Sequence, residues 1–394
     1  MLLYNSNVKG VINISIVFLC GPRIKYLRGP QKFLLDFYKW ASRNNKKYLF
    51  IVENKIFDTS KSDTTIGIDS YIINNKINNL SLITYAKYII INIIKLLYIN
   101  KLNKIELIHC QDATYSGIIG VIIKIITGVP YVSMIHGINS NVEVKNKGKF
   151  KMKYILYNKI RNYVIKNSNH VLYVGHETKK IIPKHVSSSQ FYFGVDLNQQ
   201  SLKSPSEYNI QLDNDKIIFG LLTSLTIEKR VIDVIKSYSV IADDKSHMLI
   251  AGEGSETNVL KHYVDDMGLK NHITFLGFCS NPRAFFKKID VYISYSKSEG
   301  MPISVIEALS EGKSIIVSRI EPHEEIITHR HNGLLVNSTE ELTDYMAEVI
   351  RDEKLRNDLG KNALASAKKF DIDSAFNNLE NIYYYIINYR EVTP

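Results

Sequence analysis

Two hydrophobic patterns alternate along the chain, and together they predict an α/β protein. Short runs rich in Val, Ile, Leu and Tyr are apolar at nearly every position, as in parallel strands that are covered on both faces. Between them, longer stretches carry apolar residues at helical spacing. In the first half the predicted strands are Val11–Leu19, Tyr48–Val52, Glu106–His109, Tyr131–Ile135 and His170–Val174, and the predicted helices are Gln31–Asn44, Leu80–Asn100, Gly117–Ile126, Lys151–Lys166 and His176–Ile182.

The alternation lapses over residues 196–215, where Asn, Gln, Ser, Lys and Pro205 give the composition of a linker. A second strand-and-helix series follows it. Its predicted strands are Lys216–Leu222, His247–Ala251, His272–Leu276, Val291–Ser294, Ser314–Val317 and Gly333–Val336, and its predicted helices are Val231–Ala242, Glu256–Met267, Pro282–Lys287, Ile303–Ser310, Glu340–Arg351, Lys354–Phe370 and Ser374–Tyr389.

The pattern therefore predicts two Rossmann-like, doubly wound α/β domains. We expect the first domain at 1–196, the linker at 197–215 and the second domain at 216–371. The remaining residues, 372–394, are expected to form a helix that packs back on the first domain.

Composition is that of a globular protein, with 45% hydrophobic and 23% charged residues in 394. The three cysteines, Cys20, Cys110 and Cys279, are widely separated and lack the spacing of a zinc site or a disulfide scaffold, which favours a reducing compartment. The uncharged run from Ile125 to Val142 contains several turn signals, so the sequence predicts no transmembrane helix there.

Charge is distributed unequally between the two halves. Residues 1–200 carry 28 Lys or Arg and 10 Asp or Glu, whereas residues 201–394 carry 22 and 29. The first half is thus strongly basic (+18) and the second acidic (−7), although the whole chain is +11. Such a basic half favours anionic partners, which include phosphates, acidic lipids and nucleic acids.

One stretch of the second half combines a strand end, a loop and a helix start, which is where α/β sheets bind ligands. A predicted strand ends at Ser294, and Pro302 suits the first position of a helix. The amides of Ile303 and Ser304 would then face the crevice with the positive end of the helix dipole. This geometry predicts a seat for a diphosphate.

Two glutamates lie in the same stretch. Glu299 occupies the loop with Gly300, and Glu307 follows about one turn inside the helix, where its carboxylate could bind a pair of vicinal hydroxyls. Taken as isolated residues, they would more often be a loop charge and a solvated helix residue. The motifs around them favour the functional interpretation.

These motifs resemble those of the retaining glycosyltransferases of family 4, also called glycosyltransferase group 1, which have the GT-B fold. The resemblance covers nearly all of the second half. Its segments are Leu249–Gly254 with a GxG loop, Ile273–Phe278 with "FLG", Asp290–Ser294, the E-x7-E signature from Glu299 to Glu307, Glu321–Ile327, and Asn332–Val336.

The first half resembles the family less sharply. Leu107–Asp112 and Pro130–Gly137 resemble strand ends that face the donor sugar, and Gly194–Asp196 resembles the "GVD" that closes the first domain. Arg28-Gly29-Pro30-Gln31 occupies the place of a Gly-Gly loop on the acceptor side, with Arg28 in place of the first Gly.

The resemblance implies roles for individual residues. Glu307 would bind the ribose hydroxyls of a nucleotide sugar, and Glu299 would hold the donor hexose together with the amides of the Gly300-Met301-Pro302 turn. His136 would hydrogen-bond a hexose hydroxyl, although a lone histidine is more often structural. Further donor-side residues would be Gly254, Gly277, Phe278, Ile303 and Ser304, and the acceptor side would contain Arg28, Gly29 and Asp112.

The phosphate-binding motif departs from the family pattern, G-R-L-x-x-E-K-G. Lys229 is retained, and with Glu299 and His136 it makes up the set of expected catalytic residues. Ser224, however, stands where the Arg is usual, and Arg230 replaces the closing Gly. A serine offers one neutral hydrogen bond instead of a charged, planar fork. Arg230 either compensates for this loss or is a surface charge.

The resemblance implies a metal-independent hexosyltransferase, without a cofactor, that transfers a hexose or N-acetylhexosamine from a nucleotide-diphosphate sugar with retention of configuration. Helix dipole and cationic side chains would stabilise the departing diphosphate. The expected acceptor is lipid-linked or a surface polysaccharide, such as lipopolysaccharide or capsule. The expected location is cytoplasmic, peripheral at the inner face of the plasma membrane.

Three other classes of protein compete with the glycosyltransferase interpretation. A basic nucleic-acid-binding module is disfavoured because the chain shows no signature of a known nucleic-acid-binding fold. A nicotinamide oxidoreductase is disfavoured because the turn after the first strand, Cys20–Gly29, has no GxGxxG. A GT-B sugar-nucleotide epimerase stays open, and analysis of free sugar nucleotide after incubation would distinguish it.

Basic clusters in the first half predict docking on an anionic membrane. One comprises Lys25, Arg28 and Lys32, and another comprises Lys145, Lys147, Lys149, Lys151 and Lys153. The helix Leu80–Asn100, interrupted by Lys87 and Lys95, either lies at the headgroup boundary or simply packs on the sheet.

Overall fold

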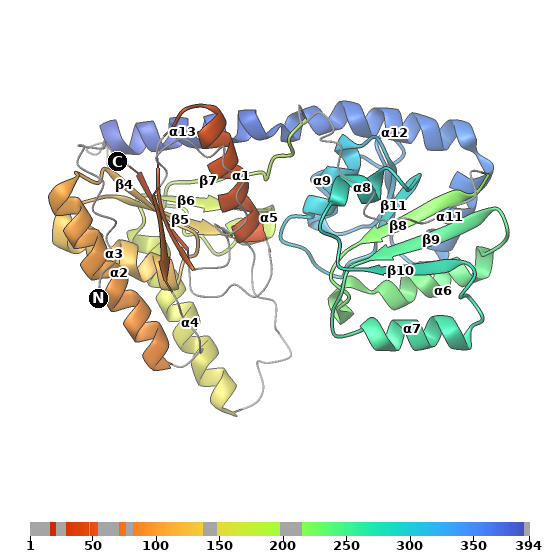
Figure 1. Cartoon of the computed structure of the whole chain (residues 1–394), viewed down its shortest axis with the longest axis horizontal. Coiled ribbons are helices and arrows are strands. Elements are labelled where there is room, and N and C mark those ends of the chain that lie inside the picture. Colours follow the sequence, from red (N-terminus) through yellow and green to blue (C-terminus); the bar gives the residue numbers. More distant parts are fainter. Residues whose placement is uncertain are drawn as a thin grey trace. The chain divides into compact units, whose positions relative to one another are not determined.

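The structure is a computed structural model that describes residues 16–20, 29–46, 48–53, 71–75, 82–136, 148–197 and 215–389. The chain divides into two compact units, each built on a parallel sheet (Figure 1). The first unit comprises Met1–Phe191 and Phe376–Pro394, and the second comprises Tyr192–Ala375. In the described part of the chain, no helix is long and apolar enough to cross a membrane.

The first unit contains a seven-stranded parallel sheet in the order β3-β2-β1-β4-β5-β6-β7. The chain builds outward from β1 to β3 and then returns to add β4 beside β1, so the winding direction reverses between β1 and β4. The strands are β1 (Ile16–Leu19), β2 (Leu49–Glu53), β3 (Tyr71–Asn75), β4 (Leu107–Cys110), β5 (Tyr131–Ile135), β6 (His170–Tyr173) and β7 (Ser188–Gln190).

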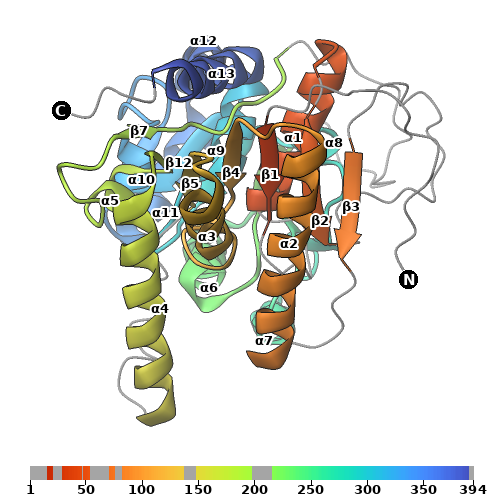
Figure 2. The same cartoon turned by 90° about the vertical axis from the view of Figure 1, so that its left-hand side faces the viewer.

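Helices cover both faces of this sheet because alternate strand residues point to opposite sides. Val17 of β1 packs with α2, α3 and α4, which lie side by side on one face (Figure 2), whereas Phe18 contacts Phe37 of α1 on the other. The helices of this unit are α1 (Gly29–Arg43), α2 (Leu82–Leu102), α3 (Tyr115–Thr127), α4 (Gly148–Asn167), α5 (His176–Lys179) and the part of α13 (Ile372–Asn388) from Phe376 onward.

Helix α13 completes the core of the first unit although it comes last in the sequence. Its Phe376 ring packs edge-on against Phe33 and Phe37 of α1, with ring centroids 5.7 and 5.0 Å away. Glu380 of the same helix pairs with Lys46 and accepts a hydrogen bond from Tyr48. The C-terminal residues are therefore part of the first unit, both by packing and by charge pairing.

The second unit repeats the same design with a six-stranded parallel sheet in the order β10-β9-β8-β11-β12-β13. Here the winding direction reverses between β8 and β11. The strands are β8 (Ile217–Leu222), β9 (Ser246–Ala251), β10 (Ile273–Gly277), β11 (Val291–Ser294), β12 (Ser314–Ser318) and β13 (Leu334–Val336).

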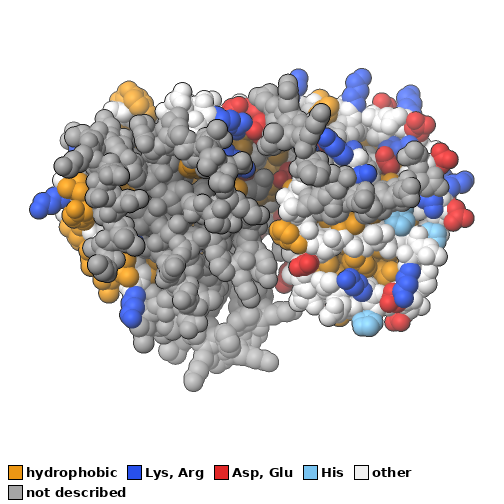
Figure 3. All heavy atoms as spheres, in the orientation of Figure 1, with side chains coloured by type: hydrophobic (Ala, Val, Ile, Leu, Met, Phe, Trp, Pro, Cys, Tyr) orange, Lys and Arg blue, Asp and Glu red, His pale blue; other side chains and the backbone are white. Residues whose placement is uncertain are grey.

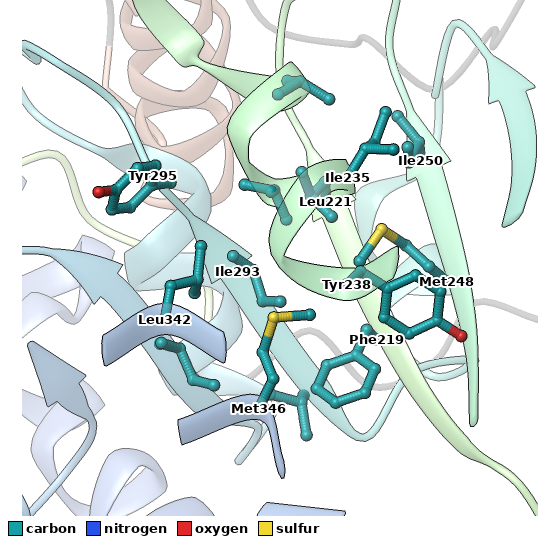
Figure 4. Close-up of a cluster of buried hydrophobic side chains, with 14 of the residues drawn as sticks. Phe219, Leu221, Ile235, Tyr238, Met248, Ile250, Ile293, Tyr295, Leu342 and Met346 are labelled. Atoms are coloured by element: carbon teal, nitrogen blue, oxygen red, sulfur yellow. The ribbon is translucent and has the colours of Figure 1, made fainter. Parts of the chain in front are cut away.

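The core of the second unit also has two layers. Phe219 and Ile293 point from the sheet toward Tyr238 of α6 and Met346 of α11 (Figure 4), while Tyr292, the neighbour of Ile293, is buried with α9 on the other face. The helices are α6 (Val231–Ile241), α7 (Thr257–Asp266), α8 (Pro282–Phe286), α9 (Ile303–Ser310), α10 (Glu321–Glu324), α11 (Thr339–Arg351) and α12 (Glu353–Ala367).

The boundary between the units lies at Phe191, before the expected domain end at 196. The reason is that Val195 belongs to the second unit, where its N–H donates to Phe370 O at 2.7 Å and its carbonyl accepts from Ile372 N at 3.1 Å. Gly194 permits this approach, since a Cβ there would lie 2.4 Å from the Cα of Ile372. Most of the expected linker lies outside the described residues.

Candidate active site

The candidate site of the second unit lies where its winding direction reverses. β8 and β11 are adjacent and parallel, with Val291 opposite Phe219, so the loops that follow both strands leave the same edge of the sheet. Doubly wound sheets bind their ligands in the crevice at this position. Residues 223–230 follow β8, and residues 295–302 follow β11.

The two loops bring Lys229 and Glu299 together. Lys229 ends a short 3₁₀ turn, Ile227–Lys229, and its Nζ lies 2.5 Å from Glu299 Oε1. The side chains are 20% and 13% exposed, so the pair is shielded but reachable. A backbone hydrogen bond from Lys297 N to Glu228 O, at 2.8 Å, ties the loops to each other. The sequence analysis predicted that both residues act on one ligand. In the structure their charged groups are in contact.

Helix α9 begins directly after the Glu299 loop. It starts at Ile303, so Pro302 is its N-cap residue and not its first helical residue. The Ile303 amide donates to Met301 O at 3.0 Å, which corrects the expectation that it is free. Within the described part of the chain, the Ser304 amide has no backbone acceptor. The α9 terminus thus presents fewer free amides than the sequence suggested.

Glu307 lies one turn into α9, partly exposed. The fully buried phenol of Tyr292 interacts electrostatically with both Glu307 and Glu299. Burial raises the pKa of Tyr292, and the negative charges of the two glutamates raise it further. The Tyr292 hydroxyl donates to Ser304 Oγ at 2.7 Å and so anchors the start of α9 to β11. Both glutamates therefore lie close to the same side chain.

The predicted GxG loop packs against the loop that carries Lys229. Gly252 has a φ of +137°, and a Cβ at this position would lie 1.8 Å from Thr223 O. At Gly254 a Cβ would lie 2.1 Å from Leu225 O. Glycine is needed at both positions because the two backbones touch. Nearby, Gly277 O accepts from Gly252 N at 2.7 Å, and Phe278 follows with 58% of its surface exposed.

Arg230 has the backbone conformation of a glycine. Its φ of +50° lies in the left-handed region, which explains why the family pattern has Gly at this place. Its Nε lies 2.7 Å from Asp233 Oδ2, and its guanidinium is 4.3 Å from the ring centroid of Tyr295. The side chain thus contacts Asp233 and Tyr295, while Ser224 is exposed near the start of the same loop.

The candidate residues of the first unit lie at the carboxyl ends of β4 and β5. His136 Nε2 is 3.2 Å from Gln111 Oε1, and burial lowers the pKa of His136 to about 4, so the imidazole is neutral. Asp112 accepts hydrogen bonds from the amides and hydroxyls of Thr114 and Ser116 before α3. Arg28 lies outside the described residues, and Gly29 is the first residue of α1.

Three residues that the sequence analysis did not name support the site. Ser296, Ser318 and His323 are all buried, and they form a hydrogen-bonded chain that ends at Glu299. His323 lies inside the motif segment Glu321–Ile327, and Ser296 lies between two motif segments, but a serine or a histidine gives no sequence signal of burial. Their role becomes visible only when β11 and β12 lie side by side.

Comparison with known proteins gives this site a family. Residues 206–365 match the model of the family described as "Glycosyl transferases group 1". These residues contain Lys229, Glu299 and Glu307, together with all the motifs that carry the resemblance in the second half, so the match confirms the resemblance to glycosyltransferase group 1. Residues 206–365 are a group 1 glycosyltransferase domain.

The chain is also similar, beyond these residues, to a protein named as a glycosyltransferase. The UDP-Gal:alpha-D-GlcNAc-diphosphoundecaprenol alpha-1,3-galactosyltransferase of Escherichia coli is 27% identical over 305 residues, which are 72% of this chain and 75% of that protein. In fold, the chain matches sucrose-phosphate synthase from Thermosynechococcus elongatus (TM-score 0.77, 13% identity) and Anabaena HepE in complex with UDP and glucose (TM-score 0.71, 17% identity). Each match covers 94% of this chain and 99% of the other. The two Rossmann-like units thus form the GT-B fold.

Proposed function

We propose that this group 1 glycosyltransferase moves a hexose, or an N-acetylhexosamine, from a nucleotide-diphosphate sugar to a lipid-linked or surface-polysaccharide acceptor. The observation that carries this proposal is the contact between Lys229 and Glu299 at the reversal point of the second sheet. There, a cation for phosphate and a carboxylate for sugar hydroxyls stand together at the start of a helix. Anabaena HepE, which has this fold, was determined in complex with UDP and glucose.

The second unit would bind the donor through five groups. The Lys229 ammonium would exchange Glu299 for the diphosphate, and the Ser304 amide at the positive end of the α9 dipole would add a hydrogen bond. Glu307 would accept hydrogen bonds from the ribose hydroxyls, and Glu299 from the hexose. The exposed ring of Phe278, beside the close-packed glycine loop, would contact the base.

Catalysis would rest on stabilising the departing nucleotide diphosphate. Negative charge grows on the leaving phosphate as the glycosidic bond breaks, and Lys229 with the Ser304 amide would stabilise it. We infer that the acceptor hydroxyl then attacks on the same face of the sugar, which gives retention, and that this needs neither a metal ion nor a cofactor. In the first unit, the imidazole of His136 is neutral at physiological pH and can hydrogen-bond a sugar hydroxyl.

A lipid-linked acceptor is favoured by the E. coli relative, whose name specifies a diphosphoundecaprenol acceptor. Such an acceptor lies in a membrane, and the first unit has a surface suited to approach one. On α2, Tyr88, Leu96 and Ile99 are buried against the sheet, while the opposite side exposes an apolar stripe. The stripe comprises Ile90, Ile91, Ile94, Tyr98 and Leu102, which are 46–61% exposed.

The charges around this stripe favour an anionic lipid surface. Helices α2, α3 and α4 lie side by side, and their sequences contain ten Lys or Arg and no Asp or Glu. By contrast, the face of the second unit that Figure 3 shows carries both signs of charge interspersed. We propose that the α2–α3–α4 face docks the enzyme peripherally on an anionic membrane. The lysine clusters expected around residues 25–32 and 145–153 lie wholly or largely outside the described side chains.

A donor panel tests the proposed reaction. The full chain is incubated with UDP-, GDP- and ADP-sugars and a diphosphoundecaprenol-linked saccharide, and nucleoside diphosphate release and glycosylated lipid are measured together. We expect one nucleotide class to give product that depends on the acceptor. Interconversion of the sugar nucleotide without acceptor would identify an epimerase, and no thermal shift with any of these donors would contradict the proposal.

A further inference from the structure

A buried histidine lies behind the candidate donor site. His323 is in α10 and is completely buried. Its Nδ1 is 2.7 Å from the carbonyl oxygen of Ser318. A carbonyl only accepts hydrogen bonds, so Nδ1 carries the proton and Nε2 has a bare lone pair. The tautomer of His323 is thereby fixed.

A chain of hydrogen bonds leads from this histidine to Glu299. The hydroxyl of Ser318 donates to Ser296 O at 2.7 Å. Ser296 then donates its own hydroxyl to Glu299 Oε1, also at 2.7 Å. Because Lys229 contacts the same oxygen, Oε1 is held from two sides. The other carboxylate oxygen, Oε2, has no hydrogen-bond partner within the described residues, and is therefore the one left for a ligand.

The imidazole of His323 is close enough to this pair to feel both charges. Burial lowers its pKa, and the nearby Lys229 lowers it further, against opposing effects of Ser318 and Glu299. Its Nε2 has no hydrogen-bond partner in the described part of the chain. An apolar side chain of similar size would avoid the cost of burying that unpaired atom. The histidine is therefore poorly explained as mere filling of the core.

We propose that His323 is a positioning residue for the transfer reaction. It fixes the end of β12 at Ser318, and through Ser296 it orients the Glu299 carboxylate so that Oε2 faces the donor hexose. This inference rests on the proposed function and deepens it. It states that residues which do not touch the sugar hold Glu299 in the orientation needed for the sugar contact. Distortion of Glu299 by even a fraction of an ångström would weaken transition-state contacts.

The test compares His323→Leu, which removes Nδ1–H, with His323→Asn, whose side-chain amide can replace that donor. We expect His323→Leu to lower kcat by roughly three- to tenfold, the value of one hydrogen bond, with little change in donor KM or in UDP affinity by calorimetry. His323→Asn should recover much of the loss. Combining His323→Leu with Ser296→Ala should reduce kcat no further than the more damaging single variant, since both act through one chain.

His247→Leu is the matched control. His247 also makes a side-chain hydrogen bond in the second unit, at 2.9 Å to Thr274. This bond joins β9 to β10, at the other end of the sheet from β12. We expect His247→Leu to change thermal stability without changing kcat. Equal kcat in wild type and His323→Leu, no recovery in His323→Asn, or additive losses in the double variant would overturn the inference. A wild-type chain inactive with all donors would instead contradict the proposed function.

Discussion

Glu299 and a bound diphosphate would compete for the ammonium group of Lys229. In the structure this ammonium lies 2.5 Å from Glu299 Oε1. Part of the binding free energy of the donor must therefore replace this contact. Variants of the two residues should affect nucleotide binding in opposite directions.

We expect Lys229→Ala to weaken binding of nucleoside diphosphate by roughly 10- to 100-fold, because a hydrogen bond to a charged group contributes about 1.5–3 kcal/mol. Glu299→Gln should bind the same ligand at least as tightly as wild type, since the competing charge is gone, yet transfer sugar more slowly. Calorimetry for binding and initial rates for transfer separate the two effects. If both variants weaken binding equally, the two residues do not compete.

Glu307 should act on binding without the competition that affects Glu299. Removing its carboxylate in Glu307→Ala should raise donor KM about tenfold or more, because charge-assisted contacts to two ribose hydroxyls are lost. Glu311→Ala is the control: Glu311 follows the same helix but pairs with Arg283 at 2.8 Å. Steady-state kinetics at limiting and saturating donor measure the change. Unchanged KM in Glu307→Ala would place the ribose elsewhere.

At the scale of elements, strand prediction succeeded where burial was uniform. β5 and β11 begin and end at the residues predicted, because apolar runs of that length occur in few other settings. β3 and β7 were missed. β7 is Ser-Ser-Gln, an edge strand whose polar side chains carry no hydrophobic signal, and β3 is a short edge strand that ends in two asparagines.

The same distinction applies to the site. The positions of Glu299 and Glu307, in the loop and the helix after β11, were predictable because these elements are continuous in sequence. The sequence analysis noted Arg230 in place of the family's glycine but did not predict its positive φ. By contrast, the chain from His323 to Glu299 depends on parallel pairing of β11 with β12, and no local pattern encodes which hydroxyl a buried serine meets.

Helix α13 couples to the first sheet through a histidine that should make stability depend on pH. His109 Nδ1 is 2.5 Å from the hydroxyl of Tyr383 in α13, and burial lowers the pKa of His109 to about 3. In the unfolded chain the pKa would be about 6.5. Between pH 6.5 and 3, His109 is protonated in the unfolded state but stays neutral in the folded state. Stability therefore falls as the pH drops from 6.5 toward 3.

We expect the free energy of unfolding of the first unit to fall by up to ~1.4 kcal/mol per pH unit on account of His109. His109→Gln should have a shallower slope, whereas His262→Gln, which changes an exposed histidine, should keep it. Fluorescence of Trp40, the single tryptophan, reports this unit because its ring packs against Phe376 of α13. Urea titrations at several pH values give the slopes. Parallel slopes for wild type and His109→Gln would show that His109 does not cause the dependence.

At the scale of the whole molecule, charge divides along the chain as the fold does. The basic half of the sequence forms nearly all of the first unit, and the acidic half forms most of the second. A nucleotide sugar is an anion, yet the residues proposed to bind it lie mainly in the acidic half. We propose that the basic surplus serves the docking on a lipid surface to which the exposed apolar stripe on α2 is suited.

The stripe and the charges should contribute separately to membrane binding. Each Lys or Arg near an anionic surface contributes about 1 kcal/mol, and this part weakens with salt as the Debye length falls to about 8 Å at physiological ionic strength. Insertion of the stripe adds about 25 cal/mol per Å² of apolar surface removed from water and does not depend on salt.

The double variant Ile90→Glu, Ile94→Glu removes part of the contribution of the apolar stripe and adds repulsion. We expect it to lower co-sedimentation with phosphatidylglycerol vesicles at least tenfold, while Val240→Glu, at a 74% exposed position on α6, leaves it unchanged. Wild type should pellet with anionic vesicles at low salt and release progressively as salt rises. Equal pelleting with neutral vesicles, or none at low salt, would contradict docking by this face and leave the transferase assignment intact.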